Sequence, residues 1–109
     1  MIRNAKHLGF VASLPCVLCG EKSIAAHIRI GGKGGTGLKP HDSHTVPLCH
    51  EHHSEQHRIG ERSFWKDVQK AINLAGYLYM NTGDFDDDSN REACMLKIAE
   101  FRREFYNQK

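Results

Sequence analysis

Val46-Pro-Leu-Cys-His-Glu-His-His-Ser-Glu-Gln-His-Arg58 is the stretch of sequence that decides the fold. It places one Cys and four His within nine residues, from Cys49 to His57. Pro47 limits the extension of a helix on its N-terminal side, so we predict a helix that starts near Leu48.

Two pairs of potential ligands lie on different faces of this predicted helix. Cys49 and His52 are three positions apart, with two residues between them, and share one face. His53 and His57 are four positions apart, with three residues between them, and share another face, about 100° away. One helix can therefore supply ligands to two sites, and we interpret the first pair as structural and the second as catalytic.

The bulk properties describe a small domain. The chain has 109 residues, four Cys and a formal charge of +2. We therefore expect a single domain over residues 1–109, with a core at about 14–65 and a helical extension at about 61–107. No apolar run approaches the length of a membrane span, and no secretory signal is recognised at the N-terminus. These features predict an intracellular, cytoplasmic protein, in which paired Cys bind metal rather than form disulfides.

Cys16 and Cys19 form the first half of a predicted zinc site. They are separated by two residues in a tight turn, and the second half is Cys49-x2-His52. Two such pairs suit the tetrahedral coordination of a structural Zn²⁺. His53 remains an alternative to His52 as the fourth ligand.

The remaining histidines predict a second site. Seven of the eight His lie between His27 and His57, a concentration that metal binding or proton transfer explains. Hydrolysis of a phosphodiester needs a base and a cation. We assign His27 as the base and His53, His57 and Asp42 as candidate ligands of a catalytic Mg²⁺ or Mn²⁺.

Basic residues around these histidines are candidate contacts to nucleic-acid phosphates. The Gly-rich segment 31–39 contains Lys33 and Lys39, and Arg29 and Arg58 lie on either side of it. Glycines would let the backbone approach a phosphate closely, although a flexible connection explains the segment equally well. The mild net charge permits nucleic-acid binding without arguing for it.

The pattern of apolar residues predicts the remaining elements. We expect helices over 5–13, 61–79 and about 89–106, and strands over 23–30 and 42–48. Ser63 is a candidate N-cap for the second of these helices. The expected buried positions of the last helix include Leu96 and Ile98.

In combination, these motifs resemble the HNH, or ββα-metal, endonuclease superfamily. The pattern is Leu-Pro-Cys-x2-Cys-Gly, Ala-His-Ile-Arg, the Gly-rich segment, Lys-Pro-x-Asp and Val-Pro-Leu-Cys-x2-His-His-x3-His. It is similar to a phage-associated branch that includes the phage recombination-enhancement nuclease. The resemblance covers about 14–65 and places His27 at the position of the general base, His44 at that of the family's Asn and His53 at that of the metal-binding His.

The resemblance implies an α+β fold with a zinc-stapled β-hairpin and helix, flanked by further helices. It also implies an endonuclease that hydrolyses DNA, single- or double-stranded, in phage or prophage recombination, with a recombination protein as a further candidate partner. Many members have Asp before the first His, whereas this chain has Ala26, and Asp42 or His57 are the candidates to replace it. The alternative is a non-catalytic zinc module that binds DNA or a recombination protein.

Overall fold

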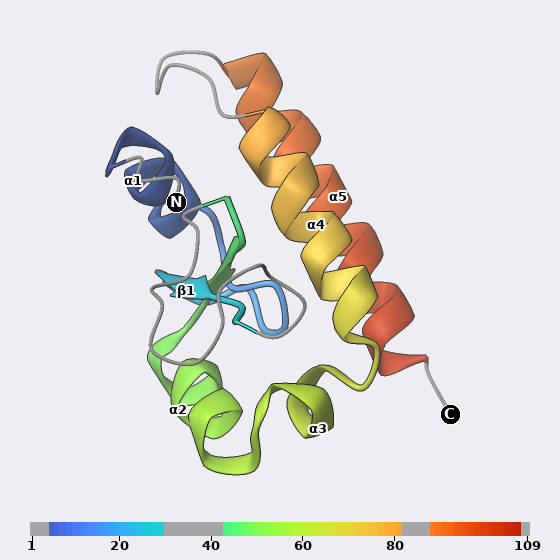
Figure 1. Cartoon of the computed structure of the whole chain (residues 1–109). Coiled ribbons are helices and arrows are strands. Elements are labelled where there is room, and N and C mark those ends of the chain that lie inside the picture. Colours follow the sequence, from blue (N-terminus) through green and yellow to red (C-terminus); the bar gives the residue numbers. More distant parts are fainter. Residues whose placement is uncertain (1–4, 30–42, 82–87, 108–109) are drawn as a thin grey trace.

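The computed structural model describes residues 5–29, 43–81 and 88–107. Within these residues the chain is α+β, with two short strands and five helices around them (Figure 1). In chain order the elements are α1 (Ala5–Ala12), β1 (Ile24–His27), β2 (Thr45–Leu48), α2 (His50–Ile59), α3 (Glu61–Trp65), α4 (Val68–Met80) and α5 (Asp88–Tyr106).

The two strands form an antiparallel sheet that brings distant segments together. Ile24 pairs with Leu48 and His27 pairs with Thr45. The amide of Ile28 also donates to the carbonyl of His44, at 2.7 Å, just beyond the last pair. The sheet therefore places the strand that ends in His27 next to the segment that leads into α2.

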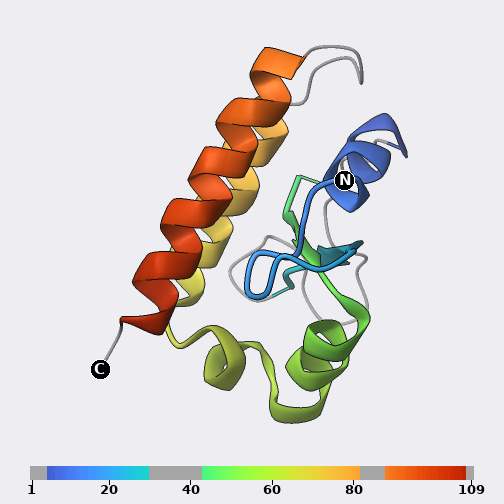
Figure 2. The ribbon, with the colours of Figure 1, turned by 180° about the vertical axis from the view of Figure 1, so that it is seen from behind.

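The sheet packs between helices. All four residues of β2 are buried, and both α1 and α4 pack against it. The core combines aliphatic strand residues with the apolar face of α4 and with Trp65, which lies against two aromatic rings of α5. Figures 1 and 2 show α4 and α5 side by side along one flank of the molecule, with α2 and α3 at one end.

The single helix predicted over 61–79 is wrong, because the chain breaks it between Trp65 and Val68. Lys66 has φ +66° and ψ −58°, and the amide of Asp67 donates to the carbonyl of Trp65 at 2.7 Å. This is a tight γ-turn, which a helix cannot contain. The side chain of Asp67, rather than the predicted Ser63, caps the following helix by accepting from the amide of Lys70.

The last helix agrees with the expectation in extent but not in every buried position. Ile98 is buried as expected, whereas Leu96 is 68% exposed. Cys94, rather than Leu96, is buried together with Ile98 on this helix. Among the residues that the structure describes, none belongs to a helix long and apolar enough to cross a membrane.

Candidate metal centre and histidine pair

Cys16 and Cys19 lie in a tight turn that points both sulfurs to the same side. The amide of Gly20 donates to the carbonyl of Cys16 at 2.9 Å and closes the turn. Gly20 has φ +80°, a conformation that residues with a Cβ rarely adopt. The amide of Val17 donates to the carbonyl of Pro47, which anchors this knuckle (residues 16–20) beside the end of β2.

Cys49 and His52 come from the first turn of α2. The helix begins at His50, two residues later than predicted, because Cys49 is its N-cap. The Cys49 sulfur accepts from the amide of His52, at 3.5 Å, and satisfies one of the free N–H groups at the helix start. An acidic residue in the first turn, Glu51, also suits the positive end of the helix dipole.

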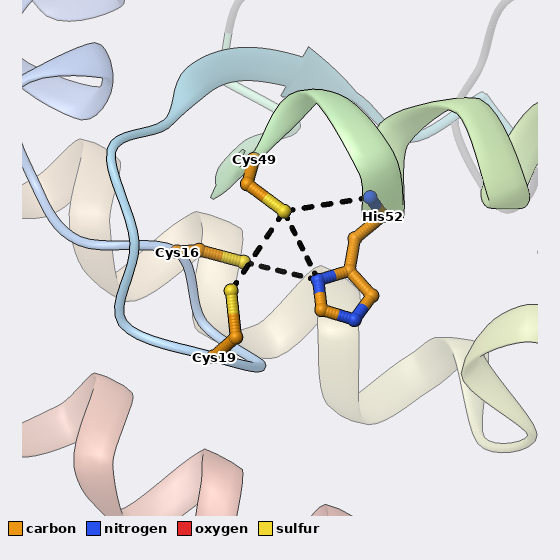
Figure 3. Close-up of side chains that lie close together, drawn as sticks. All are labelled: Cys16, Cys19, Cys49 and His52. Atoms are coloured by element: carbon orange, nitrogen blue, oxygen red, sulfur yellow. Dashed lines mark hydrogen bonds between the residues drawn. The ribbon is translucent and has the colours of Figure 1, made fainter.

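These four side chains converge on one point (Figure 3). The sulfurs of Cys19 and Cys49 are 3.7 Å apart, and Nδ1 of His52 lies 3.6 Å from the Cys16 sulfur and 3.2 Å from the Cys49 sulfur. In tetrahedral zinc sites, ligand distances of about 2.3 Å for sulfur and about 2.0 Å for nitrogen separate two sulfurs by about 3.8 Å and sulfur from nitrogen by about 3.5 Å. The cluster therefore has the dimensions of a tetrahedral Cys3His metal site.

The electrostatics of the cluster favour a cation. Burial acts to raise the pKa of the Cys16 thiol, but hydrogen bonds from backbone groups and from His52 outweigh it and lower the pKa to about 7. Loss of hydration raises the pKa of Cys19 to about 11, and the neighbouring sulfurs of Cys16 and Cys49 add to this rise. One thiolate thus forms readily while the next is opposed by like charge, and a bound divalent cation would remove that opposition.

His53 and His57 form a second pair on another face of α2, as predicted. Their Nε2 atoms are 3.2 Å apart. A cation about 2.1 Å from both nitrogens would form an angle of roughly 100° with them, which suits metal coordination. Burial lowers the pKa of His53, and the nearby imidazoles of His57, His50 and His27 lower it further. The neutral imidazole, which is the form that binds metal, is therefore favoured.

His27 lies within electrostatic reach of this pair, and the sheet brings His44 next to the strand that ends in His27. His27 is the last residue of β1 and is half-buried, and its charge contributes to the lowered pKa of His53. His44 is also half-buried, and its carbonyl accepts the amide of Ile28. The sheet therefore places the segment of His44 beside the strand that ends in His27.

A cleft of about 430 Å³ lies beside the histidine pair. Its lining includes Arg29, His57 and Glu61. Both carboxylate oxygens of Glu61 accept the backbone amide of Arg29, at 2.8 and 3.0 Å, and so tie the start of α3 to the end of β1. Arg58 is exposed on α2 and pairs with Glu55 at 3.3 Å.

Three of the predicted site residues, Asp42, Lys33 and Lys39, lie outside the described residues. Within the residues that are described, the Cys3His cluster is the group of three or more metal-ligating side chains with mutually close ligand atoms. The histidine pair offers two ligand atoms, which are 3.2 Å apart. The described part of the chain therefore contains the predicted zinc ligands together and the predicted catalytic ligands as a pair.

Several residues that shape the site were missed by the sequence interpretation. Buried Gln56 accepts the indole N–H of Trp65 at 2.7 Å and fixes the last turns of α2 against α3. Arg102 and Tyr106 of α5 donate to carbonyls of the knuckle. A Gln within a His-rich helix and an Arg far along the chain carry no local pattern that predicts these contacts. Glu61, directly after Gly60, was a signal for a helix start alone.

Comparisons with known proteins identify relatives without assigning an activity. A family model described as "Protein of unknown function (DUF968)" matches residues 1–70. The "Uncharacterized protein YdfU" of Escherichia coli (strain K12) is 43% identical over 53 residues, which cover 48% of this chain and 15% of that protein. The chain thus matches a small part of the length of that relative. No solved structure matches the chain significantly.

Proposed function

The chain belongs to the DUF968 family of unknown function, and because that description assigns no activity, we propose a function from the residues of the site. The proposal is a zinc-stabilised, metal-dependent DNA endonuclease of the HNH, or ββα-metal, type. Its phage or prophage recombination setting comes from the resemblance of the sequence motifs. The observation that carries the proposal is the arrangement on α2, where Cys49 and His52 complete a Cys3His cluster while His53 and His57 form a separate pair.

The Cys3His cluster supports a structural zinc. Three thiols and one imidazole are the ligands that zinc favours in structural sites, and all four positions are filled by protein. No position would remain open for substrate, so catalysis is assigned elsewhere. Through a metal shared with Cys49 and His52, the sulfurs of Cys16 and Cys19 would hold the knuckle to α2. The end of the sheet that leads into α2, and so to His53, would then be fixed.

The histidine pair supports a catalytic divalent ion. The Nε2 atoms of His53 and His57 are directed at each other across 3.2 Å, and two imidazoles suit Mn²⁺ better than Mg²⁺. When bound, such an ion would supply charge stabilisation for the phosphate and for the departing 3′ oxygen. His53 and His57 would hold it, with Asp42 as a further candidate ligand.

His27 would act as the general base. Its place at the end of β1, within electrostatic reach of His53, suits a base that takes a proton from water next to the bound ion. Arg29, in the cleft next to His57, is a candidate contact to the scissile strand. His44 would orient the segment that carries the base. Lys33, Lys39 and Arg58 are further candidate phosphate contacts.

The test is a plasmid-nicking assay with Mg²⁺, Mn²⁺ and a chelator control, comparing wild type with His27→Ala. We expect metal-dependent nicking that falls by roughly 10²- to 10⁴-fold in this variant, the usual range for loss of a general base. His53→Ala should lose activity at low Mn²⁺ and regain part of it at high Mn²⁺. Ser54→Ala, an exposed position on α2 outside both ligand pairs, is the matched control and should keep its activity.

The non-catalytic zinc module remains the second candidate. Ala26 stands where many HNH members have an acid, and the described residues bring two histidines, but no third ligand, within metal-binding distance of one another at the second site. If wild type nicks no DNA with any divalent metal while zinc is bound, this module becomes the better description.

A further inference from the structure

The knuckle is held from outside by the last helix of the chain. The guanidinium of Arg102 donates to the carbonyl of Val17 at 2.9 Å and to that of Cys16 at 2.7 Å. The hydroxyl of Tyr106 donates to the carbonyl of Leu18 at 2.9 Å. Three consecutive carbonyls of the knuckle therefore face α5, and Figure 2 shows the loop that contains them extending toward this helix.

The same peptide units face the metal site with their N–H groups. The backbone groups of Cys49, Leu18 and Cys19 lie close enough to the Cys16 sulfur to lower the pKa of its thiol. In a trans peptide the C=O and N–H point in opposite directions. Arg102 therefore holds the Val17–Leu18 peptide by its carbonyl, with the N–H of that peptide on the side away from Arg102. Tyr106 holds the next peptide, whose N–H belongs to Cys19, in the same way.

Charge complements this geometry. Three thiolates around a divalent metal leave a net negative charge on the cluster, and hydrogen bonds from amides to thiolates stabilise that charge. The Arg102 guanidinium adds a positive charge behind the knuckle. It also lies over Gly20, where a Cβ would be 3.6 Å from the guanidinium nitrogens. This is an ordinary van der Waals distance, so the guanidinium lies directly beside the turn.

We propose that Arg102 and Tyr106 form an outer clamp of the metal site, which holds the backbone of the knuckle between Cys16 and Cys19 in place and so slows the loss of zinc. The clamp residues are positioning residues, because they act through the backbone and touch no metal ligand atom. This inference rests on the zinc site of the proposed function and is independent of nuclease activity. The clamp residues belong to α5, which lies beyond the residues matched by the family model.

The chain offers a matched control for this idea. Arg91 is on the same helix and also donates twice from its guanidinium, to the carbonyl and the hydroxyl of Ser13, at 3.2 and 2.8 Å. Its partner precedes the knuckle. Arg91→Met therefore removes a similar tie between α5 and the rest of the chain without touching the carbonyls of the knuckle.

The experiment measures zinc release from the intact, zinc-loaded protein to the chromophoric chelator 4-(2-pyridylazo)resorcinol, together with thermal melting. We expect Arg102→Met to release zinc roughly 10- to 100-fold faster than wild type, if the usual loss of metal affinity on removing an outer hydrogen bond is expressed in the dissociation rate. Arg102→Lys keeps the charge but not the two-pronged donor, and should be intermediate. Tyr106→Phe removes the hydroxyl alone and should speed release a few-fold. Arg91→Met should release zinc at the wild-type rate, even if its melting temperature falls as much as that of Arg102→Met.

Four outcomes would overturn the clamp. If Arg102→Met and Arg91→Met speed zinc release equally, Arg102 acts through general stability alone. If Tyr106→Phe and Arg102→Lys both behave like wild type, the knuckle peptides need no support from α5, and this holds even where Arg102→Met does not fold. Wild type that takes up no zinc would end both the clamp and the proposed zinc site, whereas normal zinc uptake without faster release in the variants would refute the clamp alone.

Discussion

Replacing His52 and His53 separately by Ala tests the assignment of the two faces of α2. The residues are adjacent, both are half-buried, and both are in the first turns of the same helix, so the effect of the substitution on helix propensity largely cancels. The Nδ1 of His52 faces the sulfurs of Cys16 and Cys49. His53 instead faces His57. We therefore expect the first variant to weaken zinc binding and the second to leave it unchanged.

The expected magnitude follows from the number of ligands. Structural zinc in small domains supplies about 10–16 kcal/mol of binding free energy. Shared among four ligands, this is roughly 2.5–4 kcal/mol each, or about a 10²- to 10³-fold loss of affinity for His52→Ala. When zinc is in excess, a 100-fold weaker affinity removes about 2.7 kcal/mol of linked stability. For a domain of this size that corresponds to a melting temperature about 10 °C lower.

The assay titrates each metal-free variant with zinc in competition with a chromophoric chelator, and then records melting with and without zinc. His53→Ala should match wild type within about threefold in zinc affinity, well below the loss expected for a zinc ligand. If His53→Ala loses zinc and His52→Ala retains it, the two faces are reversed. If neither variant changes the affinity, the Cys3His cluster is not the zinc site.

Three further predictions address the rest of the molecule. Nucleic-acid binding should be weak and steeply salt-dependent, with a slope of log K against log salt of roughly −2 to −4 for a few phosphate contacts, and a salt-insensitive, sequence-specific titration would contradict it. Burial raises the pKa of Cys94 from 9.0 to about 11, so its thiol should resist iodoacetamide at pH 8 in the folded protein. Its contribution to stability is complete below the unfolded pKa and should be lost as pH rises from about 9 toward 11, which urea titrations across this range would detect. Gln56→Leu leaves the buried Trp65 N–H without its acceptor and should cost about 1–3 kcal/mol in urea unfolding, whereas Gln69→Leu, on an exposed helix face, should cost much less.

Local sequence patterns predicted the secondary structure well where a single residue type fixes the backbone conformation. The predicted zinc ligands are together in the structure, because spacing within a tight turn and within one helical turn fixes which side chains share a face. The break at Lys66 was missed because apolar periodicity continues through it from Phe64 to Ala71. Trp65, directly before that turn, packs on α5, and no pattern local to 61–79 contains that contact.

Contacts between distant segments account for the rest of what was missed. Arg102 is 85 residues from Val17 in sequence, and a basic residue on a surface helix has no feature that marks it as a donor to a particular carbonyl. Glu61 similarly has the appearance of an ordinary helix-start acid, yet its carboxylate accepts the amide of Arg29. Side chains that bind backbone groups elsewhere in the fold are invisible to spacing rules, because a carbonyl or an amide is present at nearly every residue.

The metal cluster and the histidine pair are coupled through the start of α2. Cys49 is at once the N-cap and a member of the cluster, and its carbonyl accepts the amide of His53 at 2.9 Å, the first hydrogen bond of the helix. A ten-residue helix is marginal in water by itself. At its other end it is fixed by Gln56, one residue before His57. A metal held by Cys49 would therefore fix the turn that carries His53, so the spacing of the histidine pair depends on the cluster even though the two sites share no ligand.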